Sequence, residues 1–237
     1  MTSGSPGEAH TNDEAMRAWL RSVPMFAADL PLLDAAALPA EPRALFVAWL
    51  GEVVEAGQLA ARVMTLATID ADSARASGSD GLPSARSVLL TDLDEQGFQF
   101  ASHASSPKGR ALAAHPFAAA TFFWPALGRQ VRLAGRVHRL STDAAARDFR
   151  ERSETARASI LVGRQSETLD RPEDYQTAFE RARTALRTDP SILDADWAVY
   201  ALAPDRVEFW QGSTTGPQTR VLYQRVGDSW ATSTLYP

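Results

Sequence analysis

The 237-residue sequence contains no cysteine, which excludes disulfide bonds, thiolate metal ligands and cysteine nucleophiles. It also lacks any apolar run near the ~18 residues that a membrane-spanning helix needs. The first residues, MTSGSPGEAHTNDEA, do not show the basic-then-apolar pattern of a signal peptide. We therefore expect a cytoplasmic protein that does not enter a membrane.

Positive charge is scarce as well. Lys and Arg total 24 against 29 Asp and Glu, which gives a formal net charge of −5 and disfavours a nucleic-acid partner held by counterion release. Lys108 is the single lysine. No hydrolase elbow, P-loop or dinucleotide-binding glycine turn occurs. The histidines lack the spacing of metal ligands, so we expect no metal site at His10, His103, His115 or His138.

The chain divides into a short tail and one larger domain. Residues 1–13 are polar and aperiodic and are expected to be disordered, and a short amphipathic helix follows from Glu14 to about Leu20. A proline-closed linker precedes Pro42, which opens a strongly periodic helix that ends at Gly57. We therefore predict an N-terminal tail over 1–38 and one domain over 39–237.

Later segments alternate between strands and helices. Residues 71–83 are predicted to form a polar hairpin loop, residues 141–163 a helical stretch with Ser141 or Thr142 as N-cap, and Pro172 opens another helix. Short β-branched and aromatic runs predict antiparallel strands: RVMTLATID, ARSVLLTDL, GFQFASH, AAATFFW and RQVRLAGRVHRL, then WAVYALA, DRVEFWQG, TRVLYQRV and SWATSTLY. Strands on both sides of a helical insert indicate one α+β domain.

Lys108 is the clearest isolated candidate for a binding residue. It lies in SSPKGRALAAHP, where hydroxyl residues and a proline precede a helical stretch. A helix N-terminus with a basic side chain favours an anion. An ordinary solvated helix start explains the same segment, so the segment alone leaves both readings open.

Five blocks in fixed order give a more specific indication. RVMTLATID, then GLPSARSVLLTDLDEQGFQFASHASSPKGRALAAHPFAAATFFWPALGRQVRLAGRVHRLS, then VGRQSE, VEFWQG and RVLYQR together resemble the pyridoxamine 5′-phosphate oxidase family, over about Pro39 to Pro237. The resemblance implies a six-stranded antiparallel Greek-key split β-barrel with flanking helices. It also implies a homodimer with FMN, the cofactor, in the groove between subunits.

The resemblance further implies which residues contact FMN. Arg86 and Lys108 are cations that offset the burial of a phosphate dianion. Gln130 supplies an amide for the polar edge of the isoalloxazine, and Trp210 supplies an apolar surface over its rings. The full set of implied cofactor residues is Arg86, Ser87, Val88, Leu89, Ala101, Ser102, Lys108, Gln130, Gln165, Ser166, Trp210 and Arg220.

The sequence departs from the family pattern on the substrate side. Thr91 stands where the vitamin B6 salvage oxidases have a lysine, and Pro107 stands where they often have an arginine. Their substrate tyrosine, arginine and serine correspond to Asp148, Arg152 and Ala156, and their R-L-H turn corresponds to Gly216, Pro217 and Gln218. Each lost charged hydrogen bond weakens phosphate binding by about 1.5–3 kcal/mol. Pyridoxine phosphate is therefore not the expected substrate.

We expect a redirected oxidase of secondary metabolism, such as antibiotic biosynthesis, because FASHASSPKGRALAAHPFAAATFFW is also similar to the phenazine-biosynthesis branch. It would aromatise or desaturate a reduced nitrogen-containing ring by hydride transfer to flavin N5, with reoxidation by oxygen. No general base is assigned, and the substrate-side candidates are Arg220, Gln218, Arg152 and Asp148. Asp148 and Arg152 equally fit an i,i+4 pair on a solvated helix. The alternatives are the salvage oxidase itself, a non-catalytic flavin- or haem-binding module, and a deazaflavin-dependent reductase.

Overall fold

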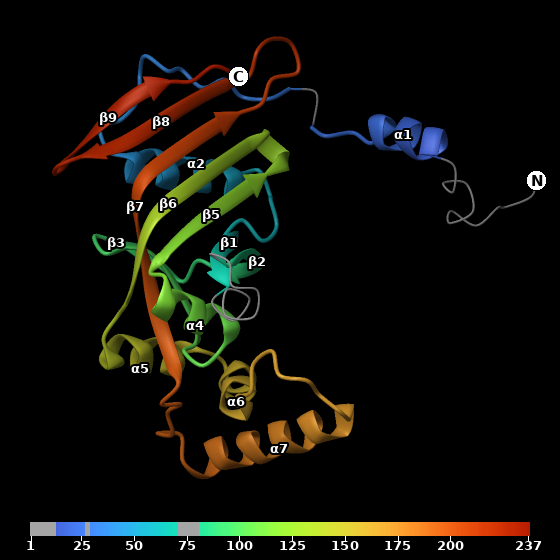
Figure 1. Ribbon diagram of the computed structural model, residues 1–237, viewed down its shortest axis with the longest axis vertical. Coiled ribbons are helices and arrows are strands. Elements are labelled where there is room, and N and C mark those ends of the chain that lie inside the picture. The colour runs from blue at the N-terminus through green and yellow to red at the C-terminus, as the bar shows by residue number, and fades with distance from the viewer. Residues whose placement is uncertain (1–12, 27–28, 71–80) are drawn as a thin grey trace, which may run out of the picture.

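The computed structural model describes residues 13–26, 29–70 and 81–237, and it consists of one antiparallel sheet with helices around it (Figure 1). Of the tail expected to be disordered over 1–13, residues 1–12 lie outside the described residues, and Asp13 is already helical. Of the loop expected over 71–83, residues 71–80 lie outside them, and Leu82 and Pro83 belong to a strand. The helices are α1 Asp13–Ser22, α2 Pro42–Glu55, α4 Pro107–Ala114, α5 Thr142–Glu151, α6 Glu154–Val162 and α7 Pro172–Thr188, with a 3-10 turn at Pro125–Leu127. The predicted α+β class is confirmed.

The sheet of the described chain has nine strands, three more than the barrel that the resemblance implies. The strands are β1 Val63–Asp70, β2 Leu82–Leu89, β3 Asp92–Asp94, β4 Gly97–His103, β5 Phe117–Trp124, β6 Arg129–Arg139, β7 Trp197–Gln211, β8 Thr219–Val226 and β9 Ser229–Thr234. Their order is β2-β1-β5-β6-β7-β4-β3, β8 pairs with β7, and β9 pairs with β8. The path ends on β2 and β3, so the sheet stays open.

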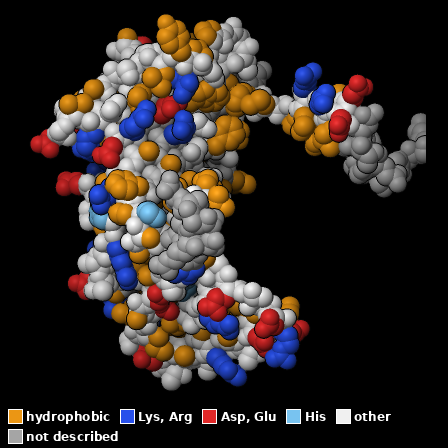
Figure 2. All heavy atoms as spheres, in the orientation of Figure 1, with side chains coloured by type: hydrophobic (Ala, Val, Ile, Leu, Met, Phe, Trp, Pro, Cys, Tyr) orange, Lys and Arg blue, Asp and Glu red, His pale blue; other side chains and the backbone are white. Residues whose placement is uncertain are grey.

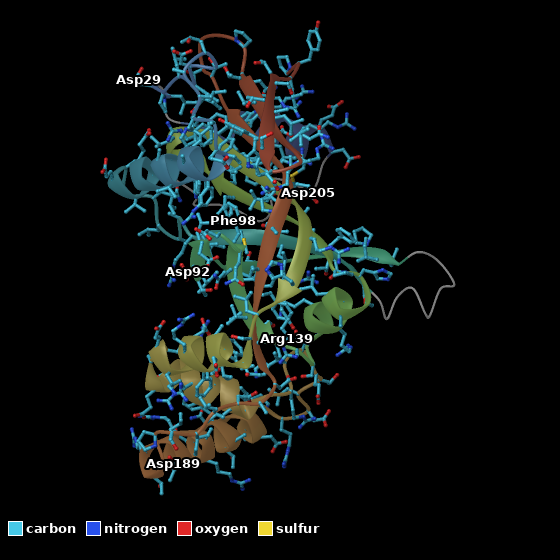
Figure 3. The ribbon with its side chains drawn as sticks, turned by 90° about the vertical axis from the view of Figure 1, so that its left-hand side faces the viewer. Asp29, Asp92, Phe98, Arg139, Asp189 and Asp205 are labelled. Carbon is cyan, nitrogen blue, oxygen red and sulfur yellow. The ribbon has the colours of Figure 1, made fainter. Side chains whose placement is uncertain are left out.

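Strand β7 joins the two halves of the sheet, although its sequence predicts two separate strands. Its first half pairs with β4 and its second half with β8, while β6 runs along both halves. Pro204 interrupts the strand pattern, but it lies opposite Gly135 at a bulge, where a residue without an N–H is tolerated. A Cβ at Gly135 would lie 2.2 Å from the Ala203 carbonyl oxygen, so glycine is required for this close approach. Figure 3 shows Asp205 on this part of β7, far from Arg139 at the end of β6.

The core lies between α2 and the sheet. The helical spacing of Phe46, Trp49 and Val53 places all three on one buried face. The Phe46 ring lies 4.8 Å from that of Phe98 and 5.0 Å from that of Phe122. The helix begins with Pro42 in its first turn and is followed by a left-handed Gly57, as the sequence predicts.

The helical insert lies at one end of the sheet, opposite β8 and β9 (Figure 1). The predicted helix over 141–163 is two helices, because two serines act as N-caps. Ser141 accepts a hydrogen bond from the Ala144 amide, and Ser153 accepts one from the Ala156 amide. Helix α7 packs against α6 and begins at Pro172 as predicted.

Candidate functional site

The end of β4 and the start of α4 bury Lys108. Ser106 caps the helix by accepting a hydrogen bond from the Gly109 amide, so Lys108 follows in the first turn. The side chain is 8% exposed, and its Nζ donates to Ser102 Oγ (2.9 Å) and Gln165 Oε1 (3.2 Å). The structure thus brings together three residues that the resemblance assigned to one cofactor. With Arg86 they form what we call the Lys108 cluster.

Arg86 supplies a second cation to the Lys108 cluster. Its guanidinium donates to the Leu66 carbonyl (3.2 Å), Thr68 Oγ1 (2.8 Å) and Ser84 Oγ (2.8 Å), which fixes its position on β2. Burial lowers the pKa of Arg86, while the charge of Asp70 acts to raise it.

The positive charge of Lys108 is not offset by its hydrogen-bond partners. Burial first, and then the positive charge of Arg86, lower the pKa of Lys108 to about 8. Ser102 and Gln165, which accept hydrogen bonds from Lys108, are both neutral, and in the described part of the chain no carboxylate forms a salt bridge with it. A buried ammonium beside another cation favours an anionic ligand that would complete its coordination.

The loop after α6 holds Gln165 in the cluster at the cost of backbone strain. Arg164 (φ 55°) and Ser166 (φ 72°) are left-handed although neither is glycine. Such residues concentrate at functional sites because the surrounding structure must hold them. Gln165 Oε1 accepts from Ser102 Oγ (3.1 Å) as well as from Lys108. A cavity of about 300 Å³ between this loop and α7 is lined by Gln165, Ser166 and Tyr175, among others.

The remaining β-strand positions flank the Lys108 cluster without bonding to it. On β2, Val88 is half-buried like Arg86, whereas Ser87 and Leu89 are exposed on the alternate face. Ala101 on β4 packs against the small hydrophobic cluster beneath the helical insert, on the face opposite to Ser102. Thr91 Oγ1 donates to the Gln99 carbonyl (3.2 Å), so its hydroxyl links the residue before β3 to strand β4.

A second group of predicted residues lies on the row formed by β5, β6, β7 and β8. In register, Phe123 lies opposite Gln130, Gln130 opposite Trp210, and Trp210 opposite Arg220. The Trp210 indole Nε1 donates to Gln218 Oε1 at 2.6 Å. We call Gln130, Trp210, Gln218 and Arg220 the ring-side cluster.

Two further residues hold the ring-side cluster. Glu208 Oε1 accepts from Arg220 Nε (2.9 Å) and Nη2 (2.7 Å), so Arg220 is paired within the chain, and Glu208 Oε2 also accepts from Arg132 Nη1 (3.3 Å). The Phe26 ring lies 5.9 Å from the Trp210 ring and 6.5 Å from the Phe123 ring. Figure 2 shows hydrophobic side chains gathered at the end of the sheet from which the N-terminal segment departs.

Ser102 of the Lys108 cluster and Trp210 of the ring-side cluster lie far apart along β7, whereas strands β1 and β5 connect Arg86 on β2 to the strand of Gln130. Ser102 pairs with Ala198 near the start of β7, and Trp210 lies near its end. These positions are twelve residues apart, which corresponds to ~40 Å along an extended strand. The residue types could be predicted from the sequence, but this separation could not, because it depends on the continuity of β7.

Asp148 and Arg152 form the predicted i,i+4 pair. Arg152 Nε and Nη2 donate to the two Asp148 oxygens (2.8 and 3.1 Å), and the Trp197 indole donates to the same carboxylate (2.7 Å). The Arg152 side chain is 24% exposed and the Asp148 side chain is 17% exposed, so the pair is not on a solvated face. Arg152 is therefore largely neutralised, and Ala156 offers no hydroxyl beside it.

Sequence reasoning missed several residues that support the clusters. Ser106 is fully buried and bonded to Ser102 (3.2 Å), and the S-S-P-K pattern of a helix cap could have indicated it. Glu208 lies within the E-F-W-Q-G block, but its pairing with Arg220 depends on strand register. Phe26 lies in an irregular segment whose sequence gives no signal. Thr68 on the neighbouring strand β1 and Ser84 on the same strand β2 orient Arg86.

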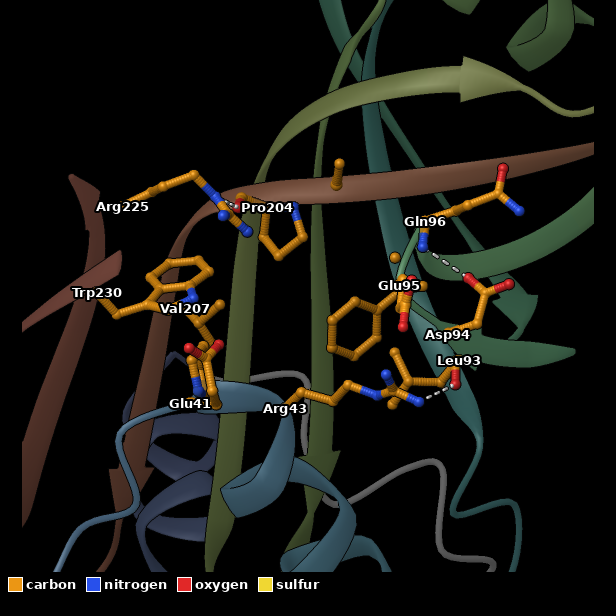
Figure 4. A pocket seen from close by; sticks show the side chains of 14 residues that line it. Glu41, Arg43, Leu93, Asp94, Glu95, Gln96, Pro204, Val207, Arg225 and Trp230 are labelled. Carbon is orange, nitrogen blue, oxygen red and sulfur yellow. Dashed lines mark hydrogen bonds between the residues drawn. The ribbon is translucent and has the colours of Figure 1, made fainter. Parts of the chain in front are cut away.

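A separate cavity of about 270 Å³ lies between the start of α2, the β3–β4 turn and the β8–β9 hairpin (Figure 4). Arg43 donates to the Leu93 carbonyl (3.0 Å) and Arg225 to that of Pro204 (3.5 Å), so backbone oxygens engage both guanidinium groups. None of the predicted site residues lines this cavity. It is therefore distinct from the two clusters.

The sequence matches the family description "Pyridoxamine 5'-phosphate oxidase" over residues 50–211 and "Pyridoxine 5'-phosphate oxidase C-terminal dimerisation region" over 197–237. The chain belongs to the pyridoxamine 5′-phosphate oxidase family. A pyridoxine/pyridoxamine 5′-phosphate oxidase of Pseudomonas syringae pv. tomato is 37% identical over 207 residues, which cover 86% of this chain and 93% of that protein. The predicted family resemblance is confirmed.

Solved structures agree with this membership of the pyridoxamine 5′-phosphate oxidase family. PhzG from Burkholderia lata, in complex with tetrahydrophenazine-1-carboxylic acid, matches with a TM-score of 0.78 and 25% identity, covering 88% of this chain and 99% of that one. An FMN-binding protein of the family from Nostoc punctiforme shares the fold, with a TM-score of 0.68 and 21% identity, covering 84% of this chain and 100% of that one.

The dimerisation region of this family member contains part of the ring-side cluster. Residues 197–237 include Trp210, Gln218 and Arg220, whereas Lys108 and Gln165 lie outside that range. No helix among the described residues is both long and apolar enough to cross a membrane.

Proposed function

We propose that the protein is an FMN-dependent oxidase whose cofactor is bound between two copies of the chain. The observation that carries the proposal is that the C-terminal dimerisation region contains Trp210, Gln218 and Arg220 of the ring-side cluster, whereas Lys108 lies outside it. Each cluster has the side-chain types that one part of a flavin requires. A second copy can supply the ring-side cluster to the Lys108 cluster of the first.

The Lys108 cluster fits the phosphate end of FMN. Lys108 is buried, its Nζ donates to the neutral oxygens of Ser102 and Gln165, and burial beside Arg86 lowers its pKa to about 8. A phosphate dianion would offset both cations and accept charge-assisted hydrogen bonds. The Ser102 hydroxyl lies beside Lys108 and donates to Gln165 Oε1 (3.1 Å), so it would donate to a phosphate oxygen by turning away from that amide, whereas the Ser106 proton is held by the His103 carbonyl (2.7 Å).

The ring-side cluster fits the isoalloxazine end. Gln130 is half-buried and carries an amide, which can both donate to and accept from the polar edge of the ring. Trp210 provides an aromatic surface whose indole N–H is already satisfied by Gln218. When bound, FMN supplies the two-electron chemistry, taking a hydride from the substrate at N5 and passing the electrons to oxygen. The protein orients the reactants and excludes water.

The substrate-side residues favour a ring compound without a phosphate group. Asp148 accepts two hydrogen bonds from Arg152, and Glu208 accepts two from Arg220, so both guanidinium groups are already engaged by carboxylates, which disfavours a phosphate dianion there. Thr91 is engaged with the Gln99 carbonyl. We therefore infer that the substrate is a reduced nitrogen-containing ring compound of secondary metabolism, of the chemical class that PhzG binds in its complex. Its N–H proton would leave to water, because no general base is assigned.

Vitamin B6 salvage is the second candidate, and the 37% identity to pyridoxine/pyridoxamine 5′-phosphate oxidases favours it. An anaerobic assay distinguishes the two functions. FMN-loaded protein is mixed with each compound in the absence of oxygen, and the flavin absorbance is followed at about 450 nm. We expect tetrahydrophenazine-1-carboxylic acid to bleach the flavin, and air to restore the colour with release of hydrogen peroxide.

The two phosphate esters of vitamin B6 should leave the flavin oxidised in the same assay. Rapid bleaching by pyridoxine or pyridoxamine 5′-phosphate alone would overturn the proposed substrate class. Bleaching by neither class would favour a non-catalytic binding module. Protein that takes up no FMN at all would contradict the cofactor assignment.

A further inference from the structure

The carboxamide oxygen of Gln218 is fixed by a hydrogen bond, and its N–H₂ group is available to donate to a ligand. An indole N–H only donates, so the atom of Gln218 that lies 2.6 Å from Trp210 Nε1 must be the carbonyl oxygen. Turning the amide over would place an N–H₂ group against another N–H and lose this bond. The Nε2 donors of Gln218 are therefore directed away from the indole.

Trp210 itself is well held, so it can fix the amide. It pairs in register with Gln130 on one side and Arg220 on the other, and the Phe26 ring packs against its indole. Gln218 is half-buried at the point where the loop enters β8. The donor direction is thus set by the sheet rather than by a freely rotating side chain.

The turn that precedes Gln218 is preorganised by Ser213 and is open at Gly216. Ser213 Oγ accepts hydrogen bonds from the amides of Thr215 (3.3 Å) and Gly216 (2.9 Å). A Cβ at Gly216 would meet only Ser213 Oγ, at 3.8 Å. A substrate that approaches the ring-side cluster therefore meets a neutral N–H donor where the family motif has arginine and histidine.

We propose that Gln218 determines specificity by donating its Nε2 hydrogens to an acceptor at the edge of the substrate ring, namely a carboxylate. The inference rests on the proposed function and names the chemical group that the site recognises. Glu208, which also pairs with Arg132, engages Arg220 through two hydrogen bonds, so we assign this contact to the fixed amide rather than to the Arg220 guanidinium. An amide does not titrate, and this recognition is therefore independent of pH where a histidine would change its charge.

The test is a binding experiment on the FMN-loaded protein. Phenazine-1-carboxylate and unsubstituted phenazine are titrated separately, and the perturbation of the flavin absorbance gives the Kd of each. Wild type should bind phenazine-1-carboxylate with a lower Kd than phenazine, and the ratio of the two Kd values is the preference for the carboxylate. Gln218→Glu keeps an acceptor for Trp210 but replaces the donors with a negative charge, so the preference should fall by ~10- to 150-fold, as expected for losing one hydrogen bond to a charged group. The Kd of phenazine should stay unchanged.

Two variants control for effects on folding and charge. Gln224→Glu makes the same substitution at an exposed position of β8 and should keep the wild-type preference. Gln218→Met removes the donors without adding charge and should also lower the preference. The preference of wild type should stay constant from about pH 5.5 to 7.5, the range in which histidine titrates.

An unchanged preference in both Gln218 variants would overturn the inference while leaving the proposed function intact. An equal loss in Gln224→Glu would overturn it as well, since the effect would then be general electrostatics. Failure of wild type to bind either phenazine would overturn the proposed substrate class together with the role of Gln218.

Discussion

Lys108→Met is the most direct test of the Lys108 cluster. Methionine keeps an apolar stem in the buried space but removes the ammonium that Ser102 and Gln165 surround. A hydrogen bond to a charged group is worth about 1.5–3 kcal/mol, so the Kd for FMN should rise by ~10- to 150-fold. Riboflavin has no phosphate, and its Kd should therefore stay close to that of wild type. Quenching of flavin fluorescence measures both constants.

Arg110→Met is the matched control, because Arg110 is an exposed cation on the same helix. It should leave both constants unchanged. Equal weakening of FMN and riboflavin in Lys108→Met would indicate general damage to the site, and undiminished FMN binding would refute the phosphate assignment.

The pH dependence of FMN binding checks the same residue. The pKa of Lys108 in the folded protein is lowered to about 8 from 10.5, so the ammonium is present below about pH 8 and is lost as pH rises through that value. The affinity for FMN should fall over that step in wild type and not in Lys108→Met. The phosphate gives up its second charge only below about pH 6, which sets the lower edge of the window.

In the flavin-free protein, the lowered pKa of Lys108 makes the free energy of unfolding rise with pH, whereas the affinity for FMN falls with pH. The unfolded chain holds the Lys108 proton up to a higher pH than the folded chain, so the free energy of unfolding should rise between about pH 8 and 10.5. Urea denaturation of flavin-free wild type and Lys108→Met across this range measures the effect, and parallel curves for the two proteins would contradict the shift.

Three further predictions address the dimer, the substrate side and the core. Lys108→Met and Trp210→Ala homodimers should each bind FMN weakly, but mixed dimers should regain one intact site, which flavin binding after subunit exchange measures; no recovery would place the cofactor within one chain. Asp148→Asn should free the charge of Arg152 and tighten the binding of inorganic phosphate as measured by calorimetry, whereas unchanged binding would mean that Arg152 does not face the site. Phe46→Ala should lower the free energy of unfolding by about 3–5 kcal/mol in urea, because it leaves a cavity between α2 and the sheet, and a change below about 1 kcal/mol would contradict the described packing.

Local patterns predict α2 well and the helical insert only in part. The spacing of Phe46, Trp49 and Val53 and the flanking Pro42 and Gly57 all indicate the helix that the structure contains. The break between α5 and α6 is not visible in the composition, since strong helix formers continue through it. It arises because the Ser153 hydroxyl caps a new helix, an alternative that sequence periodicity does not resolve.

Strand register sets the limit for predicting the site. Lys108, Ser102 and Gln165 could be grouped from the family resemblance, and the structure places them in contact. The pairing of Arg220 with Glu208 depends on which residues face one another across β7 and β8, which no local pattern specifies. The continuity of β7 through Pro204 runs against the local preference of proline and is decided by the bulge in its partner strand.

The burial of Lys108 has a consequence for the chemistry of the whole surface. The chain has no other lysine, so the exterior of the folded protein carries no primary amine on any side chain. Acylating reagents, aldehyde fixatives and enzymes that conjugate ubiquitin-like tags to lysine all require such an amine. Lys108 is the one side-chain amine that they could modify, and it lies at a position that a bound phosphate would shield.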